Sequence, residues 1–189
     1  PQKLNSYLEQ KPAPSVNQQL LAKRYIENSK NAKVFMEIKV KCEITNIGDA
    51  INSENQEYVP VISSDEAILI FTYTGPKSTG GLMDAEFNED PNGNYYEDVF
   101  MAQRVGANWL TPENIGPNIN SKNHDASIAL SSDGQKLFVF HSTPKDGGDI
   151  YLSTLTGNVW STIVPLGPNI NTKYWEGSCS LSADELTLY

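Results

Sequence analysis

The feature that most constrains this chain is a segment that occurs three times in the same register. The copies read IGDAINSENQEYVPVISSDEAILIF from Ile47, IGPNINSKNHDASIALSSDGQKLFVF from Ile115 and LGPNINTKYWEGSCSLSADELTLY from Leu166, and they align without a gap. Repetition at such a period is typical of folds that stack one supersecondary unit several times. The sequence therefore predicts one unit that is used repeatedly.

Several columns of this alignment keep their chemistry in all three copies. They are an asparagine column (Asn52, Asn120, Asn171), an acidic column (Glu57, Asp125, Glu176), a turn-serine column (Ser63, Ser131, Ser182), a turn-aspartate column (Asp65, Asp133, Asp184) and a leucine column (Leu69, Leu137, Leu188). Farther along, Asp98 and Asp149 precede Trp109 and Trp160 by the same distance. The first copy is longer than the second, and its surplus residues lie between Phe71 and Asp98.

Each copy predicts four short strands. In the second copy they cover residues 126–130, 137–141 and 149–154 and the segment around Trp160, with a tight turn at residues 131–134. An Asp-Gly pair between two alternating runs favours a hairpin, because Gly accepts positive φ. Four antiparallel strands per repeat of about 45 to 50 residues are typical of a β-propeller blade. We expect an all-β fold, a propeller with blades at about 46–109, 110–160 and 161–189, the last of them partial.

The N-terminal residues 1–38 read as a linker and an amphipathic helix ahead of a propeller at 39–189. Leu21, Tyr25, Ala32 and Phe35 recur at helical spacing after Ser15, a suitable N-cap, so one or two helices are expected. The segment 39–45, KVKCEIT, stands where a fourth strand precedes each later copy. Because the chain stops in an alternating strand pattern, we expect more chain to follow and this segment to close the ring against a later blade.

The quoted residues resemble a known family. The succession of Asn-Ser or Asn-Thr, an acidic residue, Ser-x-Asp-Gly, Leu-x-Phe, Asp-Ile-Tyr, Trp and Leu-Gly is similar to the TolB-like, WD-related β-propeller repeats of bacterial envelope proteins, over residues 42–189. A helix ahead of such a propeller is similar to Bacteroidota proteins in which tetratricopeptide helices precede it and an OmpA-like peptidoglycan-binding domain follows. The resemblance implies a periplasmic, outer-membrane-associated protein whose partners are other envelope proteins, with peptidoglycan bound through a domain outside this chain.

Composition narrows the choice of partner. Fourteen Lys and Arg stand against 23 Asp and Glu, which gives a formal net charge of −9 and repels nucleic acid phosphates. No apolar run approaches the roughly 20 residues of a membrane-spanning helix, and the first residues lack a signal-peptide pattern. Cys42 and Cys179 lie far apart and are expected to be free thiols.

The sequence offers no catalytic constellation. Its two histidines, His124 and His141, have no metal-ligand spacing, and GxSxG and phosphate-loop motifs are absent. We expect surface histidines, no cofactor and no enzyme activity. The interpretation is a non-catalytic interaction scaffold, which the resemblance implies links type IX secretion or outer-membrane protein assembly to peptidoglycan. The alternative is an accessory propeller of a larger hydrolase, such as a peptidase related to prolyl oligopeptidase.

Two groups of residues are candidates for binding. The acidic column, Glu57, Asp125 and Glu176, is expected at the start of the innermost strands, where it could face the channel and hold a cation or a basic peptide. Its repetition in every copy favours a structural role instead, accepting hydrogen bonds from the backbone of a neighbouring blade.

The other candidate lies in the surplus segment of the first copy. Asn88, Asp90 and Asn92, followed by Gly93, match the start of a calcium loop, but Val99 stands where such a loop needs a bidentate glutamate. A metal is therefore not favoured there. Loops that depart from a scaffold's repeat are also where partner contacts concentrate.

Overall fold

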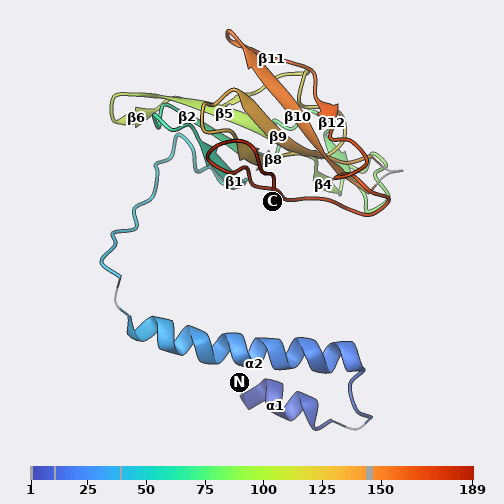
Figure 1. Cartoon of the computed structure of the whole chain (residues 1–189). Helices are drawn as coiled ribbons and strands as arrows, with labels where there is room; N and C mark the ends of the chain where they lie inside the picture. The colour runs from blue at the N-terminus through green and yellow to red at the C-terminus, as the bar shows by residue number, and fades with distance from the viewer. Residues whose placement is uncertain (1, 11, 39, 144–146) are drawn as a thin grey trace. The chain divides into compact units, whose positions relative to one another are not determined.

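The computed structural model describes residues 2–10, 12–38, 40–143 and 147–189, in two compact units (Figure 1). The first unit runs from Pro1 to Asn46 and the second from Ile47 to Tyr189. The β domain was predicted to begin at residue 39 with a strand at 39–45. Lys39 lies outside the described residues, and residues 40–46 group with the helices and contain no strand.

The helical unit contains α1 (Gln2–Leu8) and α2 (Val16–Glu37). A capping box starts α2: the Ser15 side chain accepts from the Gln18 N–H, and Gln18 Oε1 accepts from the Ser15 N–H at 2.9 Å. Within this unit Ala22 is the buried residue of α2, and Phe35 keeps 68% of its surface exposed. Among the described residues, no helix combines the length and apolar character that a membrane span needs.

The second unit is built of antiparallel strands, as predicted (Figure 1). The first sheet contains β1 (Gln56–Ile62), β2 (Ile68–Thr74) and β5 (Glu97–Val105), and β5 also pairs with β6 (Asn108–Trp109) and β7 (Glu113–Asn114). The second sheet contains β8 (Asp125–Leu130), β9 (Lys136–His141) and β10 (Asp149–Thr156), with β11 (Val159–Trp160) and β12 (Val164–Pro165) on β10. The fourth strand of each sheet is therefore divided into two short pieces.

The surplus residues of the first copy form a small hairpin of β3 (Leu82–Met83) and β4 (Asn94–Tyr95). It leaves the end of β2 and returns into β5. Both larger sheets carry an irregularity in their first strand, between Tyr58 and Val61 and between Ser127 and Ala129. In the first sheet Val59 adopts a φ of 47°, which a β-branched residue rarely does, so this bulge is strained.

Two apolar clusters hold the β unit together. Alternation along β2 puts Leu69, Phe71 and Tyr73 on one face, where they pack with Phe100, Ala102 and Ile51. The opposite face joins the two sheets through a second cluster of Ile70, Val99, Ile119, Leu137, Val139 and Trp160. Trp109 packs against the first cluster, and Trp160 belongs to the second.

The third copy lies against the second sheet with little strand pairing of its own. Leu181 and Leu188 form an isolated bridge, while Leu186 and Tyr189 are 85% and 77% exposed. The turn at Ser182 is formed as in the other copies, because its hydroxyl donates to Asp184 Oδ1 at 2.6 Å.

Candidate functional site

The asparagine column joins each copy to the sheet before it. Asn120 Oδ1 accepts from the Val99 N–H and its Nδ2 donates to the Val99 carbonyl, both at 2.8 Å. Asn171 holds Ile150 in the same way, at 3.2 and 2.8 Å. Each side-chain amide thus bonds the N–H and the carbonyl of one residue in the third strand of the preceding sheet, as a neighbouring strand would. We call this contact the asparagine clamp.

The acidic column accepts hydrogen bonds from within the same copy. Glu57 accepts from the N–H and hydroxyl of Ser53 at 3.2 and 2.5 Å, and Glu176 accepts from those of Thr172 at 2.9 and 2.6 Å. Asp125 accepts from the N–H and hydroxyl of Ser121 at 2.6 and 2.8 Å. Backbone donors from a neighbouring blade were expected, but the backbone donor found at each carboxylate belongs to the hydroxyl residue four positions earlier in the same copy. Glu176 also bonds the side chain of Asp149 in the preceding sheet.

Asp125 differs from the other two carboxylates of the column. It is fully buried, and its Oδ1 lies 2.5 Å from His141 Nδ1. His141 also packs edge-on against Tyr151, with 5.1 Å between the ring centroids. The side chains of His141 and His124 are only 13% and 16% exposed, so the prediction of two surface histidines is wrong.

Asp98, at the start of β5, is a second fully buried carboxylate. Its Oδ2 accepts from the Thr79 N–H and hydroxyl at 2.9 and 2.6 Å and from Asn114 Nδ2 at 2.7 Å, whereas its Oδ1 has no partner among the described residues. Burial raises the pKa of Asp98 and outweighs these hydrogen bonds, and the nearby charge of Asp125 adds to the rise.

A polar pocket of about 550 Å³ opens where β1 begins and β2 ends. Its charged centre is Glu97, which accepts from the Tyr58 hydroxyl and lies 2.9 Å from His124 Nδ1. Burial alone would raise the pKa of Glu97, but the contacts with His124 and Tyr58 outweigh it and lower that pKa. His124 is itself packed against Phe87 and Tyr96 of the insertion, at centroid distances of 5.5 and 5.0 Å.

The calcium candidates lie in the hairpin between β3 and β4. Asn88 Nδ2 donates to Asp84 Oδ2 at 3.2 Å, and Asp90 Oδ1 accepts from the Asn92 N–H at 2.9 Å. Gly93 closes the turn, where a Cβ would come within 1.9 Å of the Met83 carbonyl. Over the described ranges no three acidic, His or Cys side chains gather as a metal site. Calcium binding by this loop, which the sequence does not favour, stays untested.

The turn columns build one kind of turn three times. In the first sheet Asp65 Oδ1 accepts from the Ser63 hydroxyl at 2.5 Å and from the Ala67 N–H at 3.0 Å. These hydrogen bonds hold the pKa of Asp65 below its usual value, and the Ser131 hydroxyl does the same for Asp133. Gly134 has a φ of 72°, and at its position the other copies place glutamates with φ of 56° and 58°.

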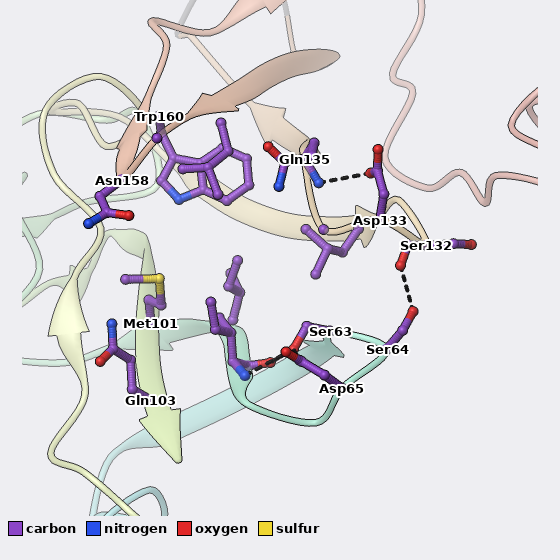
Figure 2. A pocket seen from close by; sticks show the side chains of 16 residues that line it. Ser63, Ser64, Asp65, Met101, Gln103, Ser132, Asp133, Gln135, Asn158 and Trp160 are labelled. Carbon is purple, nitrogen blue, oxygen red and sulfur yellow. Dashed lines mark hydrogen bonds between the residues drawn. The ribbon is translucent and has the colours of Figure 1, made fainter. Parts of the chain in front are cut away.

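Between the two sheets, at the end where these turns lie, there is a groove of about 390 Å³ (Figure 2). Its floor is apolar and its rim polar. The floor consists of Ile68, Ile70, Met101, Leu130, Leu155 and Trp160, and the rim includes Ser64, Asp65, Gln103, Ser132, Asp133, Gln135 and Asn158. The Ser64 hydroxyl donates to the Ser132 carbonyl at 2.5 Å and so holds the two turns together. We call this feature the turn-end groove.

Sequence reasoning missed the turn-end groove, because its lining comes from both copies and from strands that are far apart in the chain. The turn aspartates were assigned to their turns alone. Comparison of the chain with protein families, with characterised proteins and with solved structures gave no match. The fold and the site geometry are therefore what bears on function.

Proposed function

We propose that this chain is part of a β-propeller that serves as a non-catalytic protein-interaction scaffold. The observation that carries the proposal is the asparagine clamp, which recurs at Val99 and at Ile150 with the same two hydrogen bonds. Because the same clamp occurs at two successive junctions, the third copy is attached to the second sheet in the way that the second copy is attached to the first. Repeating such a junction about one axis is how four-stranded sheets assemble into a ring of roughly four to eight blades.

Two further observations favour a scaffold. The most polar buried groups are engaged in holding the repeat together: Asp125 binds Ser121 and His141, and Asp98 binds Thr79 and Asn114. The turn-end groove, in contrast, offers an apolar floor to a partner. By the resemblance stated above, we place the scaffold in the periplasm at the outer membrane, where it would link secretion or protein-assembly machinery to peptidoglycan.

The test is location and partner capture with the intact protein in its native cells. Fractionation should recover it with the outer membrane, and chemical cross-linking should capture a small set of outer-membrane proteins. A Leu137→Asp variant, which places a charge in the buried cluster between the sheets, should lose those cross-links. A variant at Val105, which belongs to the same β unit but is 61% exposed, Val105→Ser, is the matched control and should keep them. Recovery in the cytoplasmic fraction would refute the assignment, and so would hydrolysis of peptide substrates by the purified protein.

A further inference from the structure

The turn-end groove contains hydrogen-bonding groups that the fold leaves unused. The indole nitrogen of Trp160 faces the cavity on the side of Met101 (Figure 2). Trp160 is only 7% exposed as a whole, but its Nε1 is not one of the buried polar atoms that lack a partner among the described residues. The N–H therefore opens on the groove within reach of water. A tryptophan N–H normally has a partner, and the carbonyl of a bound molecule can take the place of that water.

The charged side chains that line the groove are acidic, although Lys136 lies close enough to Asp133 to lower the pKa of that carboxyl. Asp65 and Asp133 use Oδ1 for their turns, and the lining includes no basic side chain. The basic residues next to the lining in sequence are already paired, Arg104 with Glu66 at 3.2 Å and Lys136 with Glu185 at 2.6 Å. Because the serine hydroxyls lower the pKa of both aspartates, their charge persists into mildly acidic solution. The rim therefore attracts a cation.

The face of the first sheet that carries Trp109 has no apolar floor like that of the turn-end groove. The alignment that pairs Trp109 with Trp160 also pairs Arg104 with Leu155. In the first sheet the Arg104 guanidinium covers the Trp109 ring at 5.7 Å, whereas in the second sheet Leu155 and Trp160 face the groove. The apolar floor is thus specific to the gap between these two sheets and is not a general property of the repeat.

We propose that the turn-end groove binds an extended peptide segment of a partner protein that presents one apolar side chain with a lysine or arginine beside it. The apolar side chain contacts Met101 and Leu155. A peptide carbonyl accepts from Trp160 Nε1, and the basic residue lies by Asp65 or Asp133. Mostly apolar pockets with a few directed polar groups are the usual form of a ligand site. This inference rests on the proposed scaffold function and names the chemistry that one of its surfaces recognises.

The direct test measures binding of fluorescent heptapeptides to the intact protein by anisotropy. The probes have the form Gly-Ser-Lys-X-Lys-Ser-Gly, with Leu, Met, Phe or Ser as X, together with a set in which both lysines are glutamates. At least one apolar probe should bind about tenfold more tightly than the serine probe, since a buried aliphatic side chain contributes that much. The ion pair with a rim aspartate should add about fivefold in favour of lysine over glutamate, and salt should weaken that preference.

Substitutions then assign the binding to the groove. Trp160→Phe keeps a ring in the core but removes the N–H, and should weaken the best probe about fivefold. The double variant Asp65→Asn with Asp133→Asn keeps the acceptors of both turns and should abolish the preference for lysine. Trp109→Phe and Asp184→Asn alter equivalent positions outside the groove and should leave binding unchanged. Because these variants are conservative, circular dichroism identical to that of the parent protein is expected for each.

The proposal is overturned if the apolar and serine probes bind equally, or if the outside variants weaken binding as much as the groove variants. It is also overturned if sedimentation shows a dimer that Trp160→Phe dissociates, because a second copy would then occupy the groove. The scaffold function is judged separately. If Trp160→Phe captures the same outer-membrane proteins as the parent protein, the scaffold stands and the groove is not its contact.

Discussion

The acidic column gives the sharpest test of how the repeat is held together. Its three members have the same local donors, but Asp125 alone is fully buried and alone contacts a histidine. Replacing Asp125 with Leu should therefore destabilise the β unit much more than the same change at Glu57 or Glu176. A ligand-binding role would predict no such order.

The magnitudes follow from what each substitution leaves unpaired. Asp125→Leu leaves the Ser121 N–H, the Ser121 hydroxyl and His141 Nδ1 without their partner in a part-buried site, and each unpaired group costs about 1 to 3 kcal/mol. We expect a loss of about 3 to 5 kcal/mol in the free energy of unfolding. Glu57→Leu frees groups of Ser53, which is exposed and can bind water, so about 1 kcal/mol is expected.

The substitution Asp125→Asn separates the effect of the negative charge on stability from the effect of the hydrogen bonds. In Asp125→Asn the amide oxygen still accepts from Ser121 and the NH2 group can donate to a neutral His141. The cost should then be about 1 kcal/mol. Urea unfolding followed by tryptophan emission is a suitable assay, because Trp160 lies in the cluster between the sheets. Equal losses for Asp125→Leu and Glu57→Leu would refute the reasoning, as would a cation that the parent protein binds and the Asn variant does not.

Four other outcomes are expected. Asp98→Asn should raise stability at neutral pH. Because the pKa of Asp98 is raised in the folded protein, its ionisation lowers the free energy of unfolding as pH rises. That free energy, measured from pH 4 to 8, should therefore fall less steeply in the variant. His124→Leu removes the contact with Glu97, and amide exchange across residues 75–97 should speed up without a change in the second sheet. Millimolar calcium should leave the thermal midpoint unchanged, because the polar groups at 84–93 already bind one another; a calcium-dependent rise would restore the calcium loop. If residues 39–45 close a propeller ring, their amides should exchange slowly in the intact protein and rapidly in residues 1–189 alone, and equal rates would contradict closure.

The strands of the second copy could be predicted closely because local pattern determines them. Expected strands at 126–130, 137–141 and 149–154 compare with β8, β9 and β10, each within two residues at either end. Alternation and the Ser-x-Asp turn are properties of neighbouring residues, so a sequence displays them directly. The fourth strand was less predictable: Ser161 interrupts it, and its hydroxyl instead accepts from the Thr154 N–H at 3.0 Å.

The burial of the histidines could not be predicted, since it depends on residues that are distant in the chain. His124 is covered by Phe87 and Tyr96, which belong to the insertion that breaks the repeat. The donors of the acidic column, in contrast, are marked in the sequence itself. Ser53, Ser121 and Thr172 form a column of hydroxyl residues, each four positions before its carboxylate.

The division between repeated and unrepeated positions also separates the residues that join the copies from those that line the groove. Asparagine, acidic and turn columns bind their own loops or the adjacent strand, so a change in any of them disturbs a joint. Arg104 and Leu155 occupy equivalent positions but have different roles, since Arg104 covers Trp109 and Leu155 lines the groove beside Trp160. A repeat of this kind can therefore alter the surface between two sheets while its joints stay the same. Placing the residue of one sheet in the other tests this separation directly, because Leu155→Arg should abolish peptide binding in the turn-end groove and leave the asparagine clamp intact.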